Sequence, residues 1–523
     1  MPRHHRTALI RSERTRLDLP LYGGLSVAVG YPNTYHVAMS SLSFQWVVEI
    51  TARQEDTAVE RCFSDPDLAG HSLETGRPLA EFDVLAWSCS FELDAANLLR
   101  TLDAAGIPRH RDDRGSRFPL VVVGGAVASI NPLPLAPAVD VFVLGAAERL
   151  WPRLLAMTRE CDRGQLLEEL SGLDGYFVPR HHLDGDGRPL HRLRRLEKRD
   201  AHMASSDSIP YSHTVTPLTE YRNRGLVEMS RGCPEKCRYC WVSYNYGRLR
   251  CYPAAGIVER VHALRAVTDR VGFVATAVGD HPQLAEILTE CSAAGLNVSL
   301  SSLRIPAMVE GVLRPLAASG ARSVTIAPES GTDALRERLG KPISNARILE
   351  AVDTAQRCGI PDLKMYFIVG LPDEQDDDLL GICDLLRRTA EIVRERGRER
   401  GRVGKVHAGF SILVPKPYTP YQNEPMLSTD QAKRRLDLLW KGLRETDNLR
   451  LARPSHREAM WQGFLSRGDC RAFRALGSIA SGEPLSRVMK THRAEIEAAT
   501  LSPVDHDPPW RFISSAPTRT TPG

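Results

Sequence analysis

The chain has 523 residues, eleven cysteines and a formal net charge of +4, with 42% hydrophobic, 25% charged and 6% aromatic residues. This length needs more than one core, so we expect two large domains with an appended segment. The ordinary composition excludes a largely disordered chain. The small, widely spread charge gives no reason to expect a nucleic acid or an anionic membrane as a partner.

The first twenty residues are interpreted as a basic tail, because residues 1–20 lack the apolar core of a signal peptide. No later stretch is apolar enough to span a membrane. We therefore expect a cytoplasmic protein. An odd number of cysteines without an export signal argues against a disulfide framework and leaves metal binding or catalysis for any clustered set.

Residues 21–165 alternate strand-like apolar runs with helical stretches, which predicts a Rossmann-like, doubly wound parallel sheet in an α/β domain. Each predicted strand ends in Gly, Pro or Ser, so its turn should lie at the carboxyl edge of the sheet, where open α/β sheets bind ligands. Residues 166–220 are rich in charge and histidine, and are interpreted as a linker or a small antiparallel ribbon. The strands are predicted at 26–32, 82–90, 119–125 and 139–145.

Residues 221–445 resume the alternation of strands and helices, and six such units predict a partial (β/α)6 TIM-like barrel. A charge-rich run at 394–405 is typical of a solvated helix end. Residues 446–500 are predicted to be a helical C-terminal segment, and residues 501–523 a disordered tail. The barrel strands are predicted at 225–230, 271–279, 297–303, 323–329, 363–370 and 406–414.

Three cysteines, Cys233, Cys237 and Cys240, follow the first predicted barrel strand in the segment SRGCPEKCRYCW. Three thiolates leave one iron of a cubane 4Fe–4S cluster uncoordinated, and an open iron can be chelated by the amine and carboxylate of a small molecule. A structural zinc site is the alternative. Such a site usually has a fourth Cys or His ligand, and neither His213 nor Cys251 is convincing in that role.

With Arg231 and Gly232 before the first cysteine and Tyr239 before the last, the segment resembles the signature of the radical S-adenosylmethionine (radical SAM) superfamily. The resemblance implies a 4Fe–4S cluster bound by the three cysteines. It also implies that the cluster reduces bound S-adenosylmethionine, whose cleavage gives a 5′-deoxyadenosyl radical that abstracts hydrogen from the substrate. An electron donor such as flavodoxin or ferredoxin is implied as a partner.

Further residues at predicted strand ends match landmarks that bind S-adenosylmethionine in this family. Gly279 and Asp280 follow the second strand, where the family has a Gly-Gly-Glu-like turn that binds the methionine amine. Each match alone would be an ordinary loop residue, and their placement at successive strand ends favours the family. The other matches are Ser302 and Arg304 after the third strand, Glu329 and Ser330 after the fourth, and Gly370 in the Gly-Leu-Pro turn after the fifth.

A doubly wound domain before such a barrel is similar to the cobalamin-binding domain of one large radical SAM subgroup. The glycines of its turns are expected to keep side chains away from the macrocycle or its nucleotide tail. A plain α/β turn could use the same residues. The implied cobalamin contacts are Ser88 and Ser90, the pair Gly124 and Gly125, and Gly145 with Glu148.

The Asp-x-His-x-x-Gly motif that gives many cobalamin domains an axial histidine is absent, and the corresponding turn reads GYPNTYHVAMSS. A histidine ligand is therefore not expected, and a packing or surface role is favoured for Tyr35 and His36. The corrinoid is then bound without a protein ligand, or the domain is a relic. The stretch FLSRGDCRAF, with Arg467, Gly468 and Asp469, resembles a carboxyl-terminal feature of cobalamin-linked radical proteins.

The leading hypothesis is a radical SAM enzyme that uses methylcobalamin to methylate an unactivated carbon of a small-molecule or peptide substrate. The same parts without methyl transfer would serve rearrangement, cyclisation or oxidation. A tRNA methylthiotransferase would need three further cluster cysteines, and Cys62, Cys89 and Cys161 are too irregularly placed; it would also need an RNA-binding module that the tail lacks. A cobalamin or redox sensor without catalysis would not need the S-adenosylmethionine landmarks.

Overall fold

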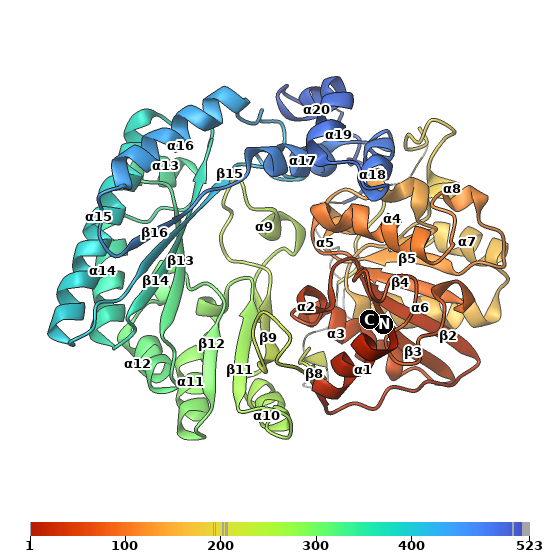
Figure 1. The fold of residues 1–523 in the computed structure, drawn as a ribbon, viewed down its shortest axis with the longest axis horizontal. Helices are drawn as coiled ribbons and strands as arrows, with labels where there is room; N and C mark the ends of the chain where they lie inside the picture. Colours follow the sequence, from red (N-terminus) through yellow and green to blue (C-terminus); the bar gives the residue numbers. More distant parts are fainter. Residues whose placement is uncertain are drawn as a thin grey trace.

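The computed structural model describes residues 2–191, 193, 195–200, 203, 208–504 and 507–514. Figure 1 shows an amino-terminal α/β unit on the right, a ring of strands and helices on the left, and carboxyl-terminal helices across the top. The predicted fold class is confirmed: a doubly wound parallel sheet is followed by a partial barrel and a helical segment.

Six strands form the amino-terminal sheet in the order β3-β2-β4-β5-β6-β7, and all pairs are parallel except β6 with β7. The strand order reverses between β2 and β4, and doubly wound sheets open a ligand crevice at the carboxyl ends beside such a point. The strands are β2 (Leu25–Tyr31), β3 (Thr57–Phe63), β4 (Val84–Ser88), β5 (Leu120–Gly124), β6 (Val141–Val143) and β7 (Tyr176–Phe177).

Helices cover both faces of this sheet, because both sets of alternating strand side chains are apolar. On one face, Val84 and Val122 pack with α3 (Leu42–Ala52), α6 (Ala147–Glu160) and α7 (Arg163–Ser171). On the other face, Leu85 and Val121 pack with α4 (Ala95–Ala104) and α5 (Ala126–Ile130). Because helices pack on both faces, the sheet is rigid and holds the loops at its carboxyl edge in fixed positions.

Two strands of this sheet were not predicted, β3 and the two-residue β7. β3 is buried along its whole length, yet it carries Glu60 and Arg61, which break its apolar pattern. The Glu60 carboxylate accepts hydrogen bonds from Ser72 and Thr75, and Arg61 pairs with Glu13 and Glu74, so both charges are compensated inside the fold. A buried strand with paired charges does not show the pattern used to find strands.

The barrel consists of two four-stranded sheets, β10-β9-β11-β12 and β13-β14-β15-β16. A hydrogen bond of 2.8 Å from the Leu303 N–H to the Thr325 carbonyl joins them. All six predicted strands are present, and the short strands β10 and β16 were not predicted. The strands are β9 (Gly225–Arg231), β10 (Arg250–Cys251), β11 (Arg270–Ala275), β12 (Asn297–Leu300), β13 (Ser323–Glu329), β14 (Asp362–Val369), β15 (Val406–Ile412) and β16 (Leu449–Ala452).

A layer of helices packs on the outer face of the barrel strands (Figure 1). Alternate residues such as Leu363 and Phe367 are buried against this layer, whereas Lys364 and Tyr366 between them are exposed. Successive strand side chains point to opposite faces, so the exposed set faces the inside of the barrel. The outer helices are α10 (Ala254–Leu264), α11 (Leu284–Ala293), α12 (Glu310–Ala318), α14 (Asn345–Arg357), α15 (Asp376–Glu399) and α16 (Thr429–Leu443).

The carboxyl-terminal helices bind the two large parts together (Figure 1). Asn131, in the loop after α5, donates a hydrogen bond of 2.6 Å to the carbonyl of Gly468, so the INPLPL and SRGD stretches meet. Glu92 of the amino-terminal unit is buried and accepts from Lys416, from Gln462 at 3.0 Å and from Ser466 at 2.8 Å. The helices are α17 (His456–Arg467), α18 (Ala472–Ala480), α19 (Leu485–Thr491) and α20 (Arg493–Thr500).

Both chain ends differ from the predicted tails where they are described. Helix α1 (Pro2–Ser12) buries Leu9, and β1 (Arg14–Thr15) pairs with β8 (Thr214–Val215). Within 507–514, Trp510 and Ile513 are 1% and 0% exposed, so this part of the predicted disordered tail is packed. Composition missed it because two apolar anchors are enough to hold a short polar segment. Residues 515–523 lie outside the described part.

Candidate functional site

The cluster loop runs from the end of β9 to α9 (Trp241–Asn245) and carries the three predicted ligands, Cys233, Cys237 and Cys240. Its first turn requires glycine at 232, where φ is +80° and an added Cβ would lie 2.2 Å from the Arg248 carbonyl. Burial raises the pKa of Cys237 to about 11. The loop is therefore pinned at its start and places three thiols at the carboxyl end of the barrel.

The three thiols lie close together: after burial, Cys233 contributes to the raised pKa of Cys240, and Cys240 contributes to the raised pKa of Cys237. Within the described ranges, no three Cys, His, Asp or Glu side chains converge on one metal ion. A cubane cluster does not need such convergence, because each cysteine binds a different iron. Just beyond Cys240, the buried Trp241 Nε1 and Ser243 Oγ have no partner among the described residues. This donor set fits a three-cysteine 4Fe–4S cluster.

Beside the loop, Arg304 connects Asp280, another predicted S-adenosylmethionine landmark, to the cluster loop itself. It forms close ion pairs with Asp280, after β11, and with Glu235, between the first two cysteines. The second carboxylate oxygen of Asp280 is buried and has no partner in the described part of the chain, which marks it as an acceptor for a missing donor. Gly279 packs against Ala307, and Ser302 is exposed at the end of β12.

Glu329 and Ser330, at the end of β13, are placed differently from one another. One oxygen of the Glu329 carboxylate, Oε1, accepts a hydrogen bond of 2.8 Å from the Tyr239 hydroxyl and pairs at 2.9 Å with Lys341. Its backbone φ of +68° is strained for a non-glycine residue. Ser330 is 1% exposed, and its hydroxyl has no partner in the described part of the chain. Glu329 thus ties the cluster loop to the barrel through Oε1, and the Ser330 hydroxyl keeps its hydrogen-bonding capacity.

Gly370 is required by the protein's own packing. It has φ of +90°, and an added Cβ would come within 2.7 Å of Leu427. The Gly370 N–H donates a hydrogen bond to Glu374. Burial raises the pKa of Glu374 to about 7, although the Gly370 N–H and Arg435 both act to lower it. This turn is therefore explained as a structural element at the barrel rim.

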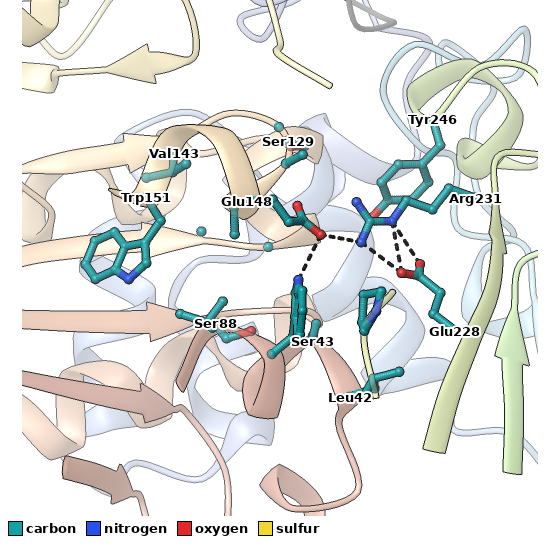
Figure 2. A pocket seen from close by; sticks show the side chains of 18 of the residues that line it. Leu42, Ser43, Ser88, Ser129, Val143, Glu148, Trp151, Glu228, Arg231 and Tyr246 are labelled. Atoms are coloured by element: carbon teal, nitrogen blue, oxygen red, sulfur yellow. Dashed lines mark hydrogen bonds and ion pairs between the residues drawn. The ribbon is translucent and has the colours of Figure 1, made fainter. Parts of the chain in front are cut away.

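A cavity of about 430 Å³ lies between the carboxyl edge of the amino-terminal sheet and the first barrel strands (Figure 2). Five of the six residues with implied cobalamin contacts line it, and Ser90 does not. Much of its wall is apolar, and two buried polar atoms of lining residues, Trp87 Nε1 and Ser230 Oγ, have no partner among the described residues. A largely apolar ring system with a polar rim fits this wall. The five are Ser88, Gly124, Gly125, Gly145 and Glu148.

Two of the glycines in this cavity wall are required for a reason other than the predicted contact with a corrinoid. An added Cβ at Gly125 would lie 2.6 Å from the Cys89 carbonyl, and one at Gly145 would lie 2.0 Å from the Arg199 carbonyl. Both also have positive φ, of +96° and +131°. Their own backbone neighbours demand glycine, so neither indicates a macrocycle. Only Gly124 is open, with its nearest neighbour, the Val143 Cβ, at 3.9 Å.

Arg231 connects this cavity to the cluster loop. Figure 2 shows its guanidinium between Glu148 of the amino-terminal unit and Glu228 of β9, at 2.6 Å and 2.8 Å. Trp46 Nε1 donates 2.9 Å to the same Glu148 oxygen. Although burial opposes it, Arg231 lowers the pKa of Glu148. Sequence reasoning identified Glu148 and Arg231 separately but missed that they form one ion pair.

Lys198 was also missed, because it lies in the segment interpreted as a linker. Its side chain is buried in the cavity wall, where Nζ donates to the Ser129 carbonyl at 3.1 Å and to the Asn245 side chain. It also lies 4.5 Å from the centre of the Tyr418 ring. Burial lowers its pKa to about 7. A lone lysine between two motif-bearing regions gives no signal in a single sequence.

Comparison with known families explains the two halves of the site. A family model described as the radical SAM superfamily matches residues 227–386, and one described as radical SAM proteins, N-terminal, matches residues 43–179. The chain belongs to the radical SAM superfamily. It is therefore a radical SAM enzyme, and membership implies a 4Fe–4S cluster and S-adenosylmethionine as its cofactors.

This radical SAM enzyme is 25% identical over 447 residues to an uncharacterized protein of Methanocaldococcus jannaschii, covering 85% of this chain and 89% of the relative. It is 25% identical over 312 residues to an uncharacterized methyltransferase of Pyrococcus horikoshii, covering 57% of this chain and 61% of the relative. Both relatives are thus matched well beyond the cluster motif.

Solved structures share the fold. The radical S-adenosylmethionine methyltransferase TsrM from Kitasatospora setae aligns over 90% of this chain and 99% of its own, with a TM-score of 0.56 and 14% identity. The cobalamin-dependent radical enzyme OxsB, with aqua-cobalamin and S-adenosylmethionine bound, aligns over 90% of this chain and 67% of its own, with a TM-score of 0.52 and 12% identity. Among the described residues, no helix has the length and apolar character needed to cross a bilayer.

Proposed function

We propose that this radical SAM enzyme is a cobalamin-dependent C-methyltransferase that acts on a small-molecule or peptide substrate. The observation that carries the proposal is the continuity of the site: Ser230 and Arg231 line the interdomain cavity, and Cys233 follows two residues later. A bound cluster would supply an electron to S-adenosylmethionine, and a bound corrinoid would supply the methyl group.

The chain's own residues hold the two sites in a fixed relation. Arg231 bridges the amino-terminal unit and β9, and Lys198 bridges Ser129 of the same unit and Asn245 of α9. Both contacts are largely shielded from water, so they keep most of their strength. A substrate between the units would meet both cofactor sites without a domain movement.

The direct test is anaerobic purification with added iron, sulfide and hydroxocobalamin, followed by measurement of iron, corrinoid and 5′-deoxyadenosine. We expect a cluster and about one corrinoid per chain. An electron donor such as flavodoxin or ferredoxin is part of the proposal, and chemically reduced flavodoxin should support 5′-deoxyadenosine release. A protein with an intact cluster and no corrinoid would exclude methyl transfer and leave rearrangement, cyclisation or oxidation. Corrinoid binding without 5′-deoxyadenosine would favour a sensor.

Replacing Gly124 with valine should block the corrinoid specifically. Gly124 lies in the cavity wall, and its Cβ position is open, so the fold should accept the change while the cavity narrows. We expect Gly124→Val to weaken corrinoid binding by about 5- to 150-fold, because overpacking a site costs about 1–3 kcal/mol. Iron content should stay unchanged.

Gly115→Val is the matched control, since an added Cβ there meets nothing within 4 Å and the residue is exposed. Corrinoid content is read from the absorption spectrum after gel filtration. Equal corrinoid in Gly124→Val and Gly115→Val would mean that the corrinoid, if bound, does not use this cavity.

Asp280 is proposed to receive the amine of S-adenosylmethionine, because its free oxygen is buried beside the cluster loop. Asp280→Ala should raise the Kd for S-adenosylmethionine by about 10- to 100-fold, the loss of one or two charge-assisted hydrogen bonds. Equilibrium dialysis of the reconstituted protein measures it. Glu286→Ala, an exposed carboxylate on α11, is the control and should bind normally.

A further inference from the structure

The inner face of the barrel carries a row of cations that none of the cofactor sites uses. Parallel register places Thr325 beside Lys364, Lys364 beside His407, and His407 beside Arg450, on β13, β14, β15 and β16. Residues paired in this way point to the same face of a sheet. Their neighbours Leu363 and Val406 are buried on the outer face, so the row faces the inside of the barrel.

Lys364 and Arg450 lie on either side of His407, and neither forms an ion pair in the described part of the chain. Lys364 and Arg450 are exposed, His407 is half-buried, and no carboxylate in the described part of the chain forms an ion pair with them. Two cations on one face of a sheet, one strand apart, create a positive potential between them. The carboxylate of Asp362, two residues before Lys364 on β14, accepts a hydrogen bond from the backbone N–H of Lys405. A bound anion would relieve the repulsion.

The pKa of His407 responds to the positive charges of the neighbouring residues in this row. Partial burial lowers it, Arg450 and Lys364 lower it further, and Lys405 adds to them, while Asp362 acts in the opposite direction. The balance is a pKa below the ordinary value, as expected for a histidine in a positive field. An anion bound on the row should therefore raise the pKa of His407.

The next inward-facing residue toward the barrel mouth is Tyr366, which is 45% exposed. Its ring lies against Gly409 of β15, where an added Cβ would come within 2.6 Å of ring carbons. The ring therefore lies flat on the sheet and offers an apolar platform above the row. From Lys364 to the end of β14 is five residues, or about 16 Å along the strand.

We propose that this row binds the anionic group, a carboxylate or a phosphate, of an elongated substrate that lies over Tyr366 and presents its other end at the barrel mouth. Calling the ligand a substrate rests on the proposed function. Binding of an anion to the row is a separate statement and is tested without turnover.

Lysine footprinting of the reconstituted protein, without S-adenosylmethionine, tests the row directly. A limiting amine-reactive acetylating reagent is applied at constant ionic strength in chloride, inorganic phosphate or glutarate, and acetylation of Lys364 is measured by mass spectrometry. With a Kd of about 1 mM, 10 mM anion fills about nine-tenths of the sites and should slow labelling of Lys364 about tenfold. Lys441, exposed on α16, is the internal control.

Arg450→Gln should reduce the protection of Lys364 and leave Lys441 unchanged, and its exposed position makes misfolding of little concern. Protection by phosphate alone, by glutarate alone or by both supports the row and tells which anion it prefers. The proposal would be overturned if Lys364 were labelled equally fast in all three salts, or if labelling of Lys441 slowed as much as labelling of Lys364. Either result leaves the corrinoid and 5′-deoxyadenosine measurements untouched, so the two proposals fail separately.

Discussion

Alanine at Cys233, Cys237 or Cys240 should reduce both iron content and 5′-deoxyadenosine formation to the level of a protein-free control. The three thiols are the only cysteines on the loop after β9, and the next cysteine in sequence, Cys251, lies on β10 outside that loop. A cubane held by two cysteines loses a metal–ligand bond outright, in contrast to the 10- to 100-fold losses typical of outer contacts. Iron analysis and the cluster absorption spectrum after anaerobic reconstitution measure the effect.

Cys161→Ser is the control, because this half-buried cysteine lies at the end of α6, outside the loop and the cavity. It should retain full iron and full product formation. Retention of 5′-deoxyadenosine formation by any of the three loop variants would contradict the assignment of the cluster. Loss of iron in Cys161→Ser would point instead to general instability of the reconstituted protein.

Arg231→Met should produce the largest loss of stability among single changes at the domain interface. It would leave the Glu148 and Glu228 carboxylates, 17% and 19% exposed, without their shared cation. Breaking a buried pair costs about 3–5 kcal/mol, so we expect about 2–3 kcal/mol at this partly exposed site. Urea unfolding of the cluster-free protein measures it. Because Arg231 precedes the cluster loop, iron retention should fall as well.

Glu148→Gln should cost less stability than Arg231→Met, because Arg231 still pairs with Glu228. A double-mutant cycle of these two changes should show coupling. Arg265→Met, on the exposed surface after α10, should change stability by less than about 0.5 kcal/mol. The pKa of Glu148 is lowered in the fold, so the pair stabilises fully above the unfolded pKa and is lost as the pH falls below about 4. Additive effects in the cycle would exclude a shared ion pair.

Much of the fold follows from local pattern. Strands such as β5 and β14 are continuous or alternating apolar runs that end in glycine turns, and such signals survive in a single sequence. β3 and β16 do not carry them: β3 contains a buried Glu and Arg, and β16 is four residues long with Arg450 inside it. Their position depends on partners elsewhere in the chain, which local pattern does not contain.

The candidate site was predictable where spacing alone defines the chemistry, as in the cysteine loop. The site was not predictable where it depends on contacts between residues that are far apart in the sequence. Arg231 and Glu148 are 83 residues apart, and Lys198 and Asn245 are 47 apart. Glu329 shows another case: its strand-end place suggested a cofactor contact, and the structure adds that Tyr239 and Lys341 both contact its Oε1.

Glu92 has a consequence for how the protein is made. Glu92 is synthesised early in translation. The residues that contact its carboxylate are synthesised more than three hundred residues later, and they are Lys416, Gln462 and Ser466. Until then the amino-terminal unit holds a charge that has no partner inside the protein, so this edge must remain hydrated. A growing chain therefore passes through a stage in which this end of the amino-terminal sheet is not yet covered by α17.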